Sequence, residues 1–268
     1  MKHKPKDKSK PSMQIPWENL MGIALQPPQL NVETMNKIEE ALVPYTCKLR
    51  WEKWEVAKIK NSGTAILLHG ASGCGKTTTA RWMAKKVGTG FIPITMADFG
   101  GGDPGDSERN AKAIFDFGRS QDNPTIYIDE CDGILWSRDK AGPDSMWMLT
   151  VVNQFLMLIE KYLGLIVLST NALKVLDPAL MRRLAAIVEI GMPDVKTRFH
   201  LWKQKLPSNY PITINELQYS KLTAIKLTGS DIELALIQEA RIACREGRLP
   251  KFDSLYTIAK QLEKKPEK

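Results

Sequence analysis

The sequence is poor in the residues that build metal centres and disulfide frameworks. Its 268 residues include four cysteines and three histidines, and no two cysteines form a C-x-x-C pair. A zinc site is therefore not expected, and isolated thiols fit a reducing compartment. No uncharged apolar run reaches the ~18 residues of a membrane span. The first twelve residues have no apolar segment behind their lysines, unlike a secretory signal, so we expect a cytoplasmic protein with no membrane partner.

Positive charge is unevenly distributed along the chain. The formal net charge is +8, and residues 1–10 alone carry five lysines against one aspartate. Residues 260–268 add four lysines and two glutamates, which leaves the rest of the chain near neutral. We expect residues 1–12 and 263–268 to be disordered, solvated tails. The alternative is that the basic N-terminal tail attracts nucleic acid or another anionic surface.

Short apolar runs alternate with helical patterns through the middle of the chain. Five runs are typical of buried strands: residues 64–69, 91–95, 125–129, 165–169 and 186–190. Their alternation with helices predicts an α/β fold with a parallel sheet covered on both faces. Ahead of the first run, apolar residues at helical spacing predict a helix over residues 31–43, capped by Asn31.

The strand patterns end after Pro193. Four helical patterns follow, at residues 196–205, 214–222, 229–245 and 252–262. Glycine and proline punctuate the chain just before them, at Gly191 and Pro193. The predicted division is therefore an α/β domain over residues 13–192 and a small all-helical domain over residues 193–262.

A glycine-rich loop separates the first predicted strand from the next helix. It has the pattern G-x-x-x-x-G-K-T in the required order of strand, loop and helix. Glycines let successive backbone N–H groups turn toward phosphate oxygens, and the helix adds the positive end of its dipole. The lysine reaches the β- and γ-phosphates, and the threonine hydroxyl is a hard oxygen ligand for Mg²⁺. The predicted site for ATP and Mg²⁺ comprises Gly70, Ala71, Ser72, Gly73, Cys74, Gly75, Lys76, Thr77 and Thr78.

Acidic and amide side chains follow two further predicted strands. Asp129 and Glu130 follow the third strand, and Asn171 follows the fourth. Beside a phosphate loop, Asp129 would serve Mg²⁺ together with Thr77, and Glu130 would polarise the attacking water. Asn171 would hold that water or the γ-phosphate by a hydrogen bond. These positions predict Glu130 and Asn171 as catalytic residues of a phosphoryl transfer.

These motifs, in this order, make the chain similar to the AAA branch of the AAA+ ATPases over roughly residues 15–247. Residues 70–77 resemble the Walker A motif, residues 125–132 the Walker B motif and residues 168–171 sensor 1. The resemblance implies a five-stranded, doubly wound P-loop NTPase sheet with a small C-terminal helical lid. Residues 17–22 resemble the adenine-pocket segment of the family, and residues 227–240 resemble its lid helix. The nucleotide contacts implied by these two segments are Leu20, Met21, Gly22, Gly229 and Ser230.

The resemblance also implies that neighbouring subunits share each active site. Residues 176–183 resemble the family segment whose arginines stabilise transition-state charge in the next subunit. The candidates here are Arg182 and Arg183, which are adjacent, whereas the family often separates two such arginines by a short spacer. Either one could reach across, and the other could form an ion pair within its own subunit. The implied assembly is a homo-oligomer, a ring or spiral of six, with a helical filament as the alternative.

One departure from the family concerns the central pore. Rings that thread polypeptides carry an aromatic loop just before a segment that corresponds here to Gly105–Glu108. The preceding residues 101–104 include no aromatic side chain, and Phe99 lies too early in the chain. We expect Phe99 to pack in the core or against its loop, which weakens the expectation of a threading motor.

The expected function is Mg²⁺-dependent ATP hydrolysis by an oligomer that remodels a macromolecular partner, with a protein substrate or adaptor. The alternative is a DNA-associated ATPase, a loader or a regulator of transposition or replication, that assembles on duplex DNA. Its binding would depend steeply on salt. A nucleotide-gated scaffold with slow hydrolysis is disfavoured, because it would not need Glu130, Asn171 and the paired arginines.

Overall fold

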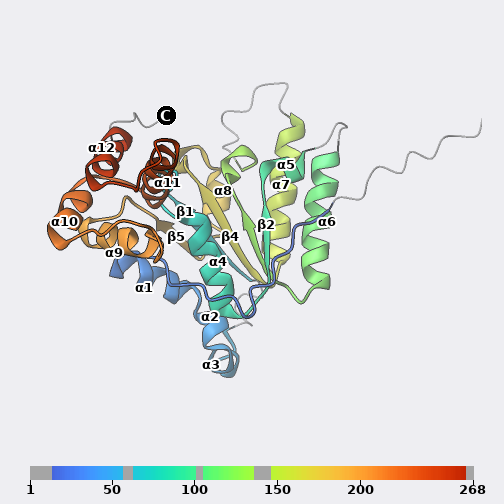
Figure 1. Cartoon of the computed structure of the whole chain (residues 1–268). Coiled ribbons are helices and arrows are strands. Elements are labelled where there is room, and N and C mark those ends of the chain that lie inside the picture. The colour runs from blue at the N-terminus through green and yellow to red at the C-terminus, as the bar shows by residue number, and fades with distance from the viewer. Residues whose placement is uncertain (1–13, 57–62, 101–104, 136–145, 264–268) are drawn as a thin grey trace, which may run out of the picture.

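Five parallel strands form the centre of the protein. The computed structural model describes residues 14–56, 63–100, 105–135 and 146–263 (Figure 1). The strands lie side by side in the order β2-β3-β4-β1-β5. Their bounds are β1 Thr64–His69, β2 Phe91–Ile94, β3 Thr125–Ile128, β4 Leu165–Thr170 and β5 Ala186–Glu189. The predicted parallel sheet is confirmed, and its strands lie within one or two residues of the predicted runs.

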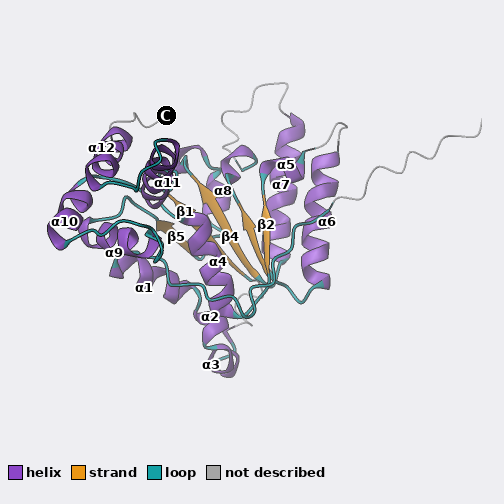
Figure 2. Cartoon of the chain, viewed as in Figure 1, coloured by secondary structure: helices purple, strands orange, loops and turns teal. Residues whose placement is uncertain are grey.

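Helices cover both faces of this sheet (Figure 2). Alternate residues of β1 point to opposite faces, as strand geometry requires, so each face has a core of its own. Ile66 and Leu68 pack with residues of α1 (Val32–Ala41) and α4 (Lys76–Val87). Ala65 and Leu67 pack with residues of α6 (Asp106–Ser120) and α7 (Met146–Lys161). The fold is thus a doubly wound α/β P-loop architecture, as predicted.

Local sequence signals explain where several helices begin. Asn31 is the N-cap of α1, and its side chain accepts a hydrogen bond of 2.8 Å from the Thr34 backbone N–H. This satisfies one of the helix's free donors, as predicted for this residue. The remaining helices of the sheet-containing part are short: α2 Val43–Thr46, α3 Lys48–Lys53, α5 Met96–Phe99 and α8 Pro178–Met181.

The last four helices form a unit with its own core. They are α9 Val195–Lys205, α10 Glu216–Ala224, α11 Gly229–Arg245 and α12 Phe252–Glu263. Trp202, Leu222, Ile232 and Leu255 are fully buried among them. Figure 1 shows this unit beside β1 and β5, whereas α6 and α7 lie toward β2. The predicted domain boundary at residues 192/193 falls between β5 and α9, where strands give way to helices.

A buried carboxylate fastens the helical unit internally. Glu239 on α11 has no exposed surface, and it accepts hydrogen bonds of 2.7 Å from Arg248 Nη1 and 2.8 Å from the Lys251 backbone N–H. Ser254 at the start of α12 also donates to Glu239. Burial alone would raise the pKa of Glu239, but these hydrogen bonds lower it below its ordinary value. The network joins α11 to α12 across the loop that contains Arg248.

Candidate nucleotide-binding site

The loop between β1 and α4 has a backbone that requires glycine. Gly70, Gly73 and Gly75 have φ values of +143°, +78° and +99°, which L side chains rarely adopt. A Cβ on Gly70 would lie 2.2 Å from the Ile190 carbonyl oxygen, so β5 closes against the loop at this position. Helix α4 begins directly afterwards at Lys76, which places a helix N-terminus at the loop. This is the geometry predicted for a phosphate cradle.

Lys76 connects this loop to the end of β4. Its Nζ donates hydrogen bonds to the Gly70 and Ala71 carbonyls, at 2.8 and 3.0 Å, and to Asn171 Oδ1 at 2.6 Å. Burial lowers the pKa of Lys76, and the nearby negative groups, Asp129 and Glu130 among them, oppose this effect. Two residues predicted from separate motifs, 95 positions apart, are therefore in direct contact.

The acidic residues Asp129 and Glu130 directly follow β3, which is a neighbour of β4 in the sheet. Ile128 is paired with Leu168, so Asp129 lies beside Ser169 of β4. Ser169 Oγ donates to Asp129, and Glu130 N–H contacts Asp129 Oδ1 at 3.1 Å. Glu130 itself is exposed and has a left-handed backbone, with φ of +52°. A non-glycine residue in this conformation is strained, and such strain is concentrated at functional sites.

Two residues of this cluster were missed in the sequence analysis. Tyr127 and Ser169 lie inside the apolar runs of β3 and β4, yet their hydroxyls meet at 3.0 Å. The Tyr127 hydroxyl also lies 3.0 Å from Thr77 Oγ1. Burial raises the pKa of Tyr127, so it stays protonated. A hydroxyl within a run of buried aliphatic residues was the available signal, since a buried hydroxyl needs a partner.

The donor types at this edge fit Mg²⁺. Thr77 Oγ1 and the Asp129 carboxylate are hard oxygen ligands, and Mg²⁺ commonly takes one or two protein groups together with phosphate oxygens and water. Both side chains contact the same Tyr127–Ser169 pair. Among the described residues, no group of three or more His, Cys, Asp or Glu side chains could hold a metal ion. A metal ion at this edge would therefore also need phosphate oxygens or water as ligands.

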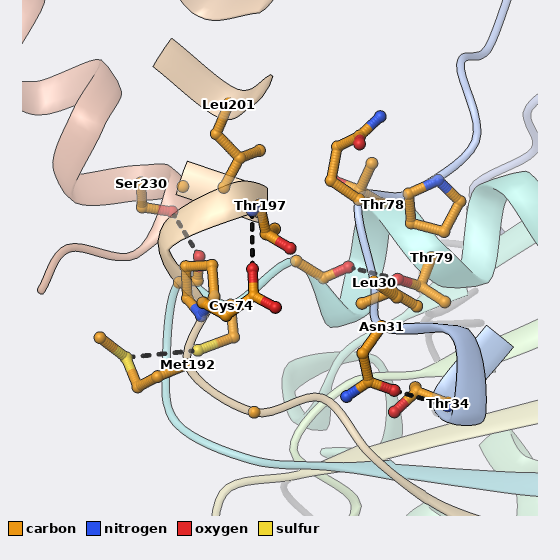
Figure 3. A pocket seen from close by; sticks show the side chains of 18 of the residues that line it. Leu30, Asn31, Thr34, Cys74, Thr78, Thr79, Met192, Thr197, Leu201 and Ser230 are labelled. Carbon is orange, nitrogen blue, oxygen red and sulfur yellow. Dashed lines mark hydrogen bonds between the residues drawn. The ribbon is translucent and has the colours of Figure 1, made fainter. Parts of the chain in front are cut away.

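A cavity of about 240 Å³ lies between the phosphate loop and the helical unit (Figure 3). Gly73, Cys74 and Thr78 line one side, and Gly229 and Ser230 of α11 line another. The Ser230 backbone N–H contacts the Gly73 carbonyl at 3.4 Å, which brings the helical unit onto the loop. The remaining wall combines apolar and amide side chains with charged ones: Gln26, Pro28, Leu30, Met192 and Leu201, and Glu189, Asp194, Lys205 and Glu233. Such a mixed wall beside a phosphate cradle suits a nucleoside.

Comparisons with known proteins agree with this geometry. The model of the family described as "ATPase family associated with various cellular activities (AAA)" matches residues 66–192, which contain β1–β5, the phosphate loop and the acidic edge. This chain belongs to the AAA+ ATPase superfamily. No helix among the described residues is long and apolar enough to cross a membrane.

Several curated AAA proteins are similar to the chain. The proteasome-activating nucleotidase of Saccharolobus solfataricus is 30% identical over 68% of this chain and 48% of its own length. The cell division cycle protein 48 homolog of Archaeoglobus fulgidus is 31% identical over 70% of this chain and 26% of its own. Vacuolar protein sorting-associated protein 4 of Dictyostelium discoideum is 31% identical over 65% and 40%. The chain thus spans about half, or less, of each of these relatives.

A solved structure supports the AAA+ fold over a longer stretch. A chain in the HORMA:CdnC:Trip13 complex of E. coli MS115-1 superposes with a TM-score of 0.65. The match covers 85% of both chains at 21% sequence identity. At this identity the likeness concerns the fold alone.

Residues 17–22, the segment predicted to line the adenine pocket, do not line the cavity in this AAA+ chain. Leu20 is 3% exposed and packs in the α1–α4 core, whereas Met21 is 80% exposed. Neither these two residues nor Gly22 lines the cavity; the chain a few residues later, from Gln26 to Asn31, lines it instead. The reason is that Glu18 holds this segment beside the sheet. Its carboxylate accepts two hydrogen bonds of 2.8 Å from Arg81, and its backbone forms an isolated β-bridge with Phe91.

The two candidate arginine fingers have different surroundings. Arg183 is half-buried; its Nη1 donates to the Ala179 carbonyl at 2.8 Å, and its Nε lies 2.8 Å from Glu160 Oε1 of α7, outside hydrogen-bond geometry. Arg182 is exposed and forms no ion pair with any residue that the structure describes. The two adjacent arginines therefore differ in burial and in partners, and the sequence alone did not show which of them is free to contact a neighbour.

Phe99 packs in the core, as predicted. It is 3% exposed, and its ring meets Phe155 of α7 edge-on at 5.1 Å between centroids. An aromatic side chain held in this way is not available to grip a substrate. Residues 101–104, the position that corresponds to the family's aromatic loop, lie outside the described residues.

Proposed function

We propose that this chain hydrolyses ATP to ADP and phosphate in a Mg²⁺-dependent reaction, as an oligomer that remodels a protein partner. The observation that carries the proposal is the convergence of Lys76, Asn171, Asp129 and Glu130 at one edge of the sheet. These residues come from three separate motifs, and the sheet order brings their strands together. A glycine-rich structural turn would not need them.

The proposed roles follow from chemistry and position. Lys76 and the loop N–H groups hold the β- and γ-phosphates, and Gly229 and Ser230 close the nucleoside side. Thr77 and Asp129 would hold Mg²⁺, which when bound neutralises phosphate charge. Glu130, exposed at the end of β3, polarises the attacking water, and Asn171 positions it.

Arg182 is the better candidate for the residue that acts in a neighbouring subunit. Arg183 is occupied by the Ala179 carbonyl and by Glu160 of its own subunit. Arg182 is exposed on the same short segment and is available to a neighbour. An arginine that completes the site of the next subunit makes hydrolysis dependent on assembly, for which we propose a ring or spiral of six.

A protein partner is favoured by the names of the relatives, which include a proteasome-activating nucleotidase and a vacuolar protein sorting-associated protein. The named alternative, assembly on duplex DNA, draws on the basic tail. The steady-state ATPase rate, measured at low salt with and without duplex DNA, separates the two. No stimulation by DNA supports the protein partner; strong stimulation that fades with added salt supports the alternative.

Glu130→Gln tests the catalytic assignment. The variant keeps the size and shape of the side chain but has no carboxylate to accept the proton of water. We expect nucleotide affinity and assembly to persist while turnover falls about 10²- to 10⁴-fold. Unchanged turnover would remove Glu130 from this role, and Lys76→Ala, which should lose nucleotide binding, is the control for contaminating ATPase.

Mixing experiments test the arginine assignment. Arg182→Ala and Arg183→Ala are each mixed with wild-type protein over a range of ratios, and the ATPase rate is recorded. Because Arg182 would complete a neighbour's site, activity should fall more steeply than the mutant fraction for Arg182→Ala and in proportion for Arg183→Ala. A proportional loss with Arg182→Ala would contradict the assignment.

A further inference from the structure

A tyrosine in the middle of β3 links the two residues expected to hold Mg²⁺. Tyr127 is 1% exposed, and its ring stacks on Phe91 of β2 with 5.6 Å between centroids. Its hydroxyl lies 3.0 Å from Thr77 Oγ1 and 3.0 Å from Ser169 Oγ. Ser169 in turn contacts Asp129. Four side chains thus form one continuous chain of hydrogen bonds across α4, β3 and β4.

The charge at one end fixes the direction of every proton in this chain. An ionised carboxylate only accepts, so Ser169 donates its single proton to Asp129. The Ser169 oxygen then accepts from Tyr127, whose own proton is used in that bond. The Tyr127 oxygen is left as an acceptor, and the Thr77 hydroxyl must donate to it.

This direction has a consequence for Thr77. A hydroxyl has one proton and two acceptor lone pairs. With its proton committed to Tyr127, Thr77 Oγ1 is left with lone-pair density for a cation and cannot turn its proton toward one. The same chain fixes one oxygen of Asp129 and leaves the other oxygen for water or metal.

We infer that Tyr127 is a positioning residue that, through Ser169, orients Thr77 and Asp129 for Mg²⁺. The inference rests on the proposed nucleotide site and gives a role to two residues, Tyr127 and Ser169, to which the sequence analysis assigned none. Ser169 extends the effect to Glu130, whose backbone N–H contacts Ser169 Oγ at 3.4 Å. The hydroxyls of β3 and β4 therefore support both the metal ligands and the residue proposed to activate water.

A purely structural role for the Tyr127 hydroxyl is the competing explanation, and the chain offers a matched control. Tyr162 is also fully buried, and its hydroxyl donates to the Pro124 carbonyl in the core on the α7 face. That bond ends on the backbone, away from the phosphate loop. Tyr→Phe at either position removes one buried hydroxyl and leaves the ring.

The experiment compares full-length wild type, Tyr127→Phe, Ser169→Ala, the double variant and Tyr162→Phe. Binding of a fluorescent ATP analogue is titrated with Mg²⁺ and with EDTA. The Mg²⁺ concentration for half-maximal binding is recorded together with the melting temperature. These readings separate an effect on the metal ligands from a general loss of structure, and none of them depends on turnover.

We expect Tyr127→Phe and Ser169→Ala each to raise the half-maximal Mg²⁺ concentration about five- to tenfold, the effect of losing one hydrogen bond. Affinity in EDTA should stay within about twofold of wild type, since Lys76 and the loop are unchanged. Tyr162→Phe should lower the melting temperature by about 2–4 °C without shifting the Mg²⁺ titration. The double variant should shift the titration no further than either single change, because both interrupt the same chain.

Two results would overturn the inference. One is a Mg²⁺ titration of Tyr127→Phe that coincides with that of wild type or of Tyr162→Phe. The other is a double variant whose shift is the sum of the two single shifts, which would show independent contacts. Wild-type protein that binds no nucleotide would instead overturn the proposed function, and with it the inference, so the two failures are distinguishable.

Discussion

Two buried polar networks in this protein look alike locally and differ in how they end. In the helical unit, Glu239 accepts hydrogen bonds from Arg248, Lys251 and Ser254, and Arg248 also pairs with Glu246, so this network is closed in the sense that its charges are paired with one another. At the sheet edge, the chain that starts at Thr77 reaches Asp129 and continues to Glu130, which is exposed. A closed network stabilises a fold, whereas an open one presents groups to a ligand. Burial and perturbed pKa values alone do not separate the two cases.

The comparison predicts its largest effect on stability in the helical unit. Glu239→Ala removes three hydrogen bonds from the α11–α12 interface and leaves the half-buried Arg248 with only one of its two carboxylate partners, Glu246. We expect a loss of about 2–4 kcal/mol in the free energy of unfolding of this unit, roughly 1 kcal/mol for each hydrogen bond to the buried carboxylate. Urea denaturation followed by tryptophan fluorescence measures it, because Trp202 lies in the core of the unit. A loss below about 1 kcal/mol would place Glu239 among surface ion pairs instead.

For the network at the sheet edge we expect the opposite pattern, a loss of activity without a loss of stability. Asp129→Asn removes a charge from a cluster in which Glu130 and Asp132 are close neighbours along the chain. We expect Mg²⁺-dependent ATP turnover to fall about 100-fold, which corresponds to ~2.7 kcal/mol, with a melting temperature equal to or above that of wild type. Turnover that survives together with a lowered melting temperature would make Asp129 a structural residue like Glu239.

Lowering the pH should destabilise the helical unit, by a smaller amount than Glu239→Ala does. Hydrogen bonding lowers the pKa of Glu239 in the folded state, so its stabilising contribution is complete above the ordinary glutamate pKa of about 4.3. The contribution is lost as the pH falls below that value and through the folded-state pKa. Unfolding of the helical unit should therefore depend more steeply on pH below about 4.3 in wild type than in Glu239→Gln. Equal slopes for the two proteins would contradict a lowered pKa.

Much of the site could be predicted from the sequence because its chemistry lies in short segments. The phosphate loop requires glycines at fixed intervals, and three of them have the expected positive φ. The acids and Asn171 directly follow apolar runs, and parallel strands bring such residues to one edge. Leu20 and Met21 show the limit of this reasoning. Their motif predicted that Leu20 and Met21 would line the nucleotide cavity, but residues 26–31 line it, because Leu20 packs in the core and the Glu18–Arg81 pair holds this segment beside the sheet.

By itself, the sequence determined the α/β class, the five strands, the helical unit and the glycine-rich loop between β1 and α4, since each depends on local pattern and spacing. The tertiary structure alone decided three further points. It brought Tyr127 of β3 to Thr77 of α4 and Ser169 of β4, it buried Glu239 against Arg248, and it separated Arg183, held by its own subunit, from the exposed Arg182. Each of these depends on which side chains meet across elements. That is set by strand order and core packing, and neighbouring sequence letters do not encode it.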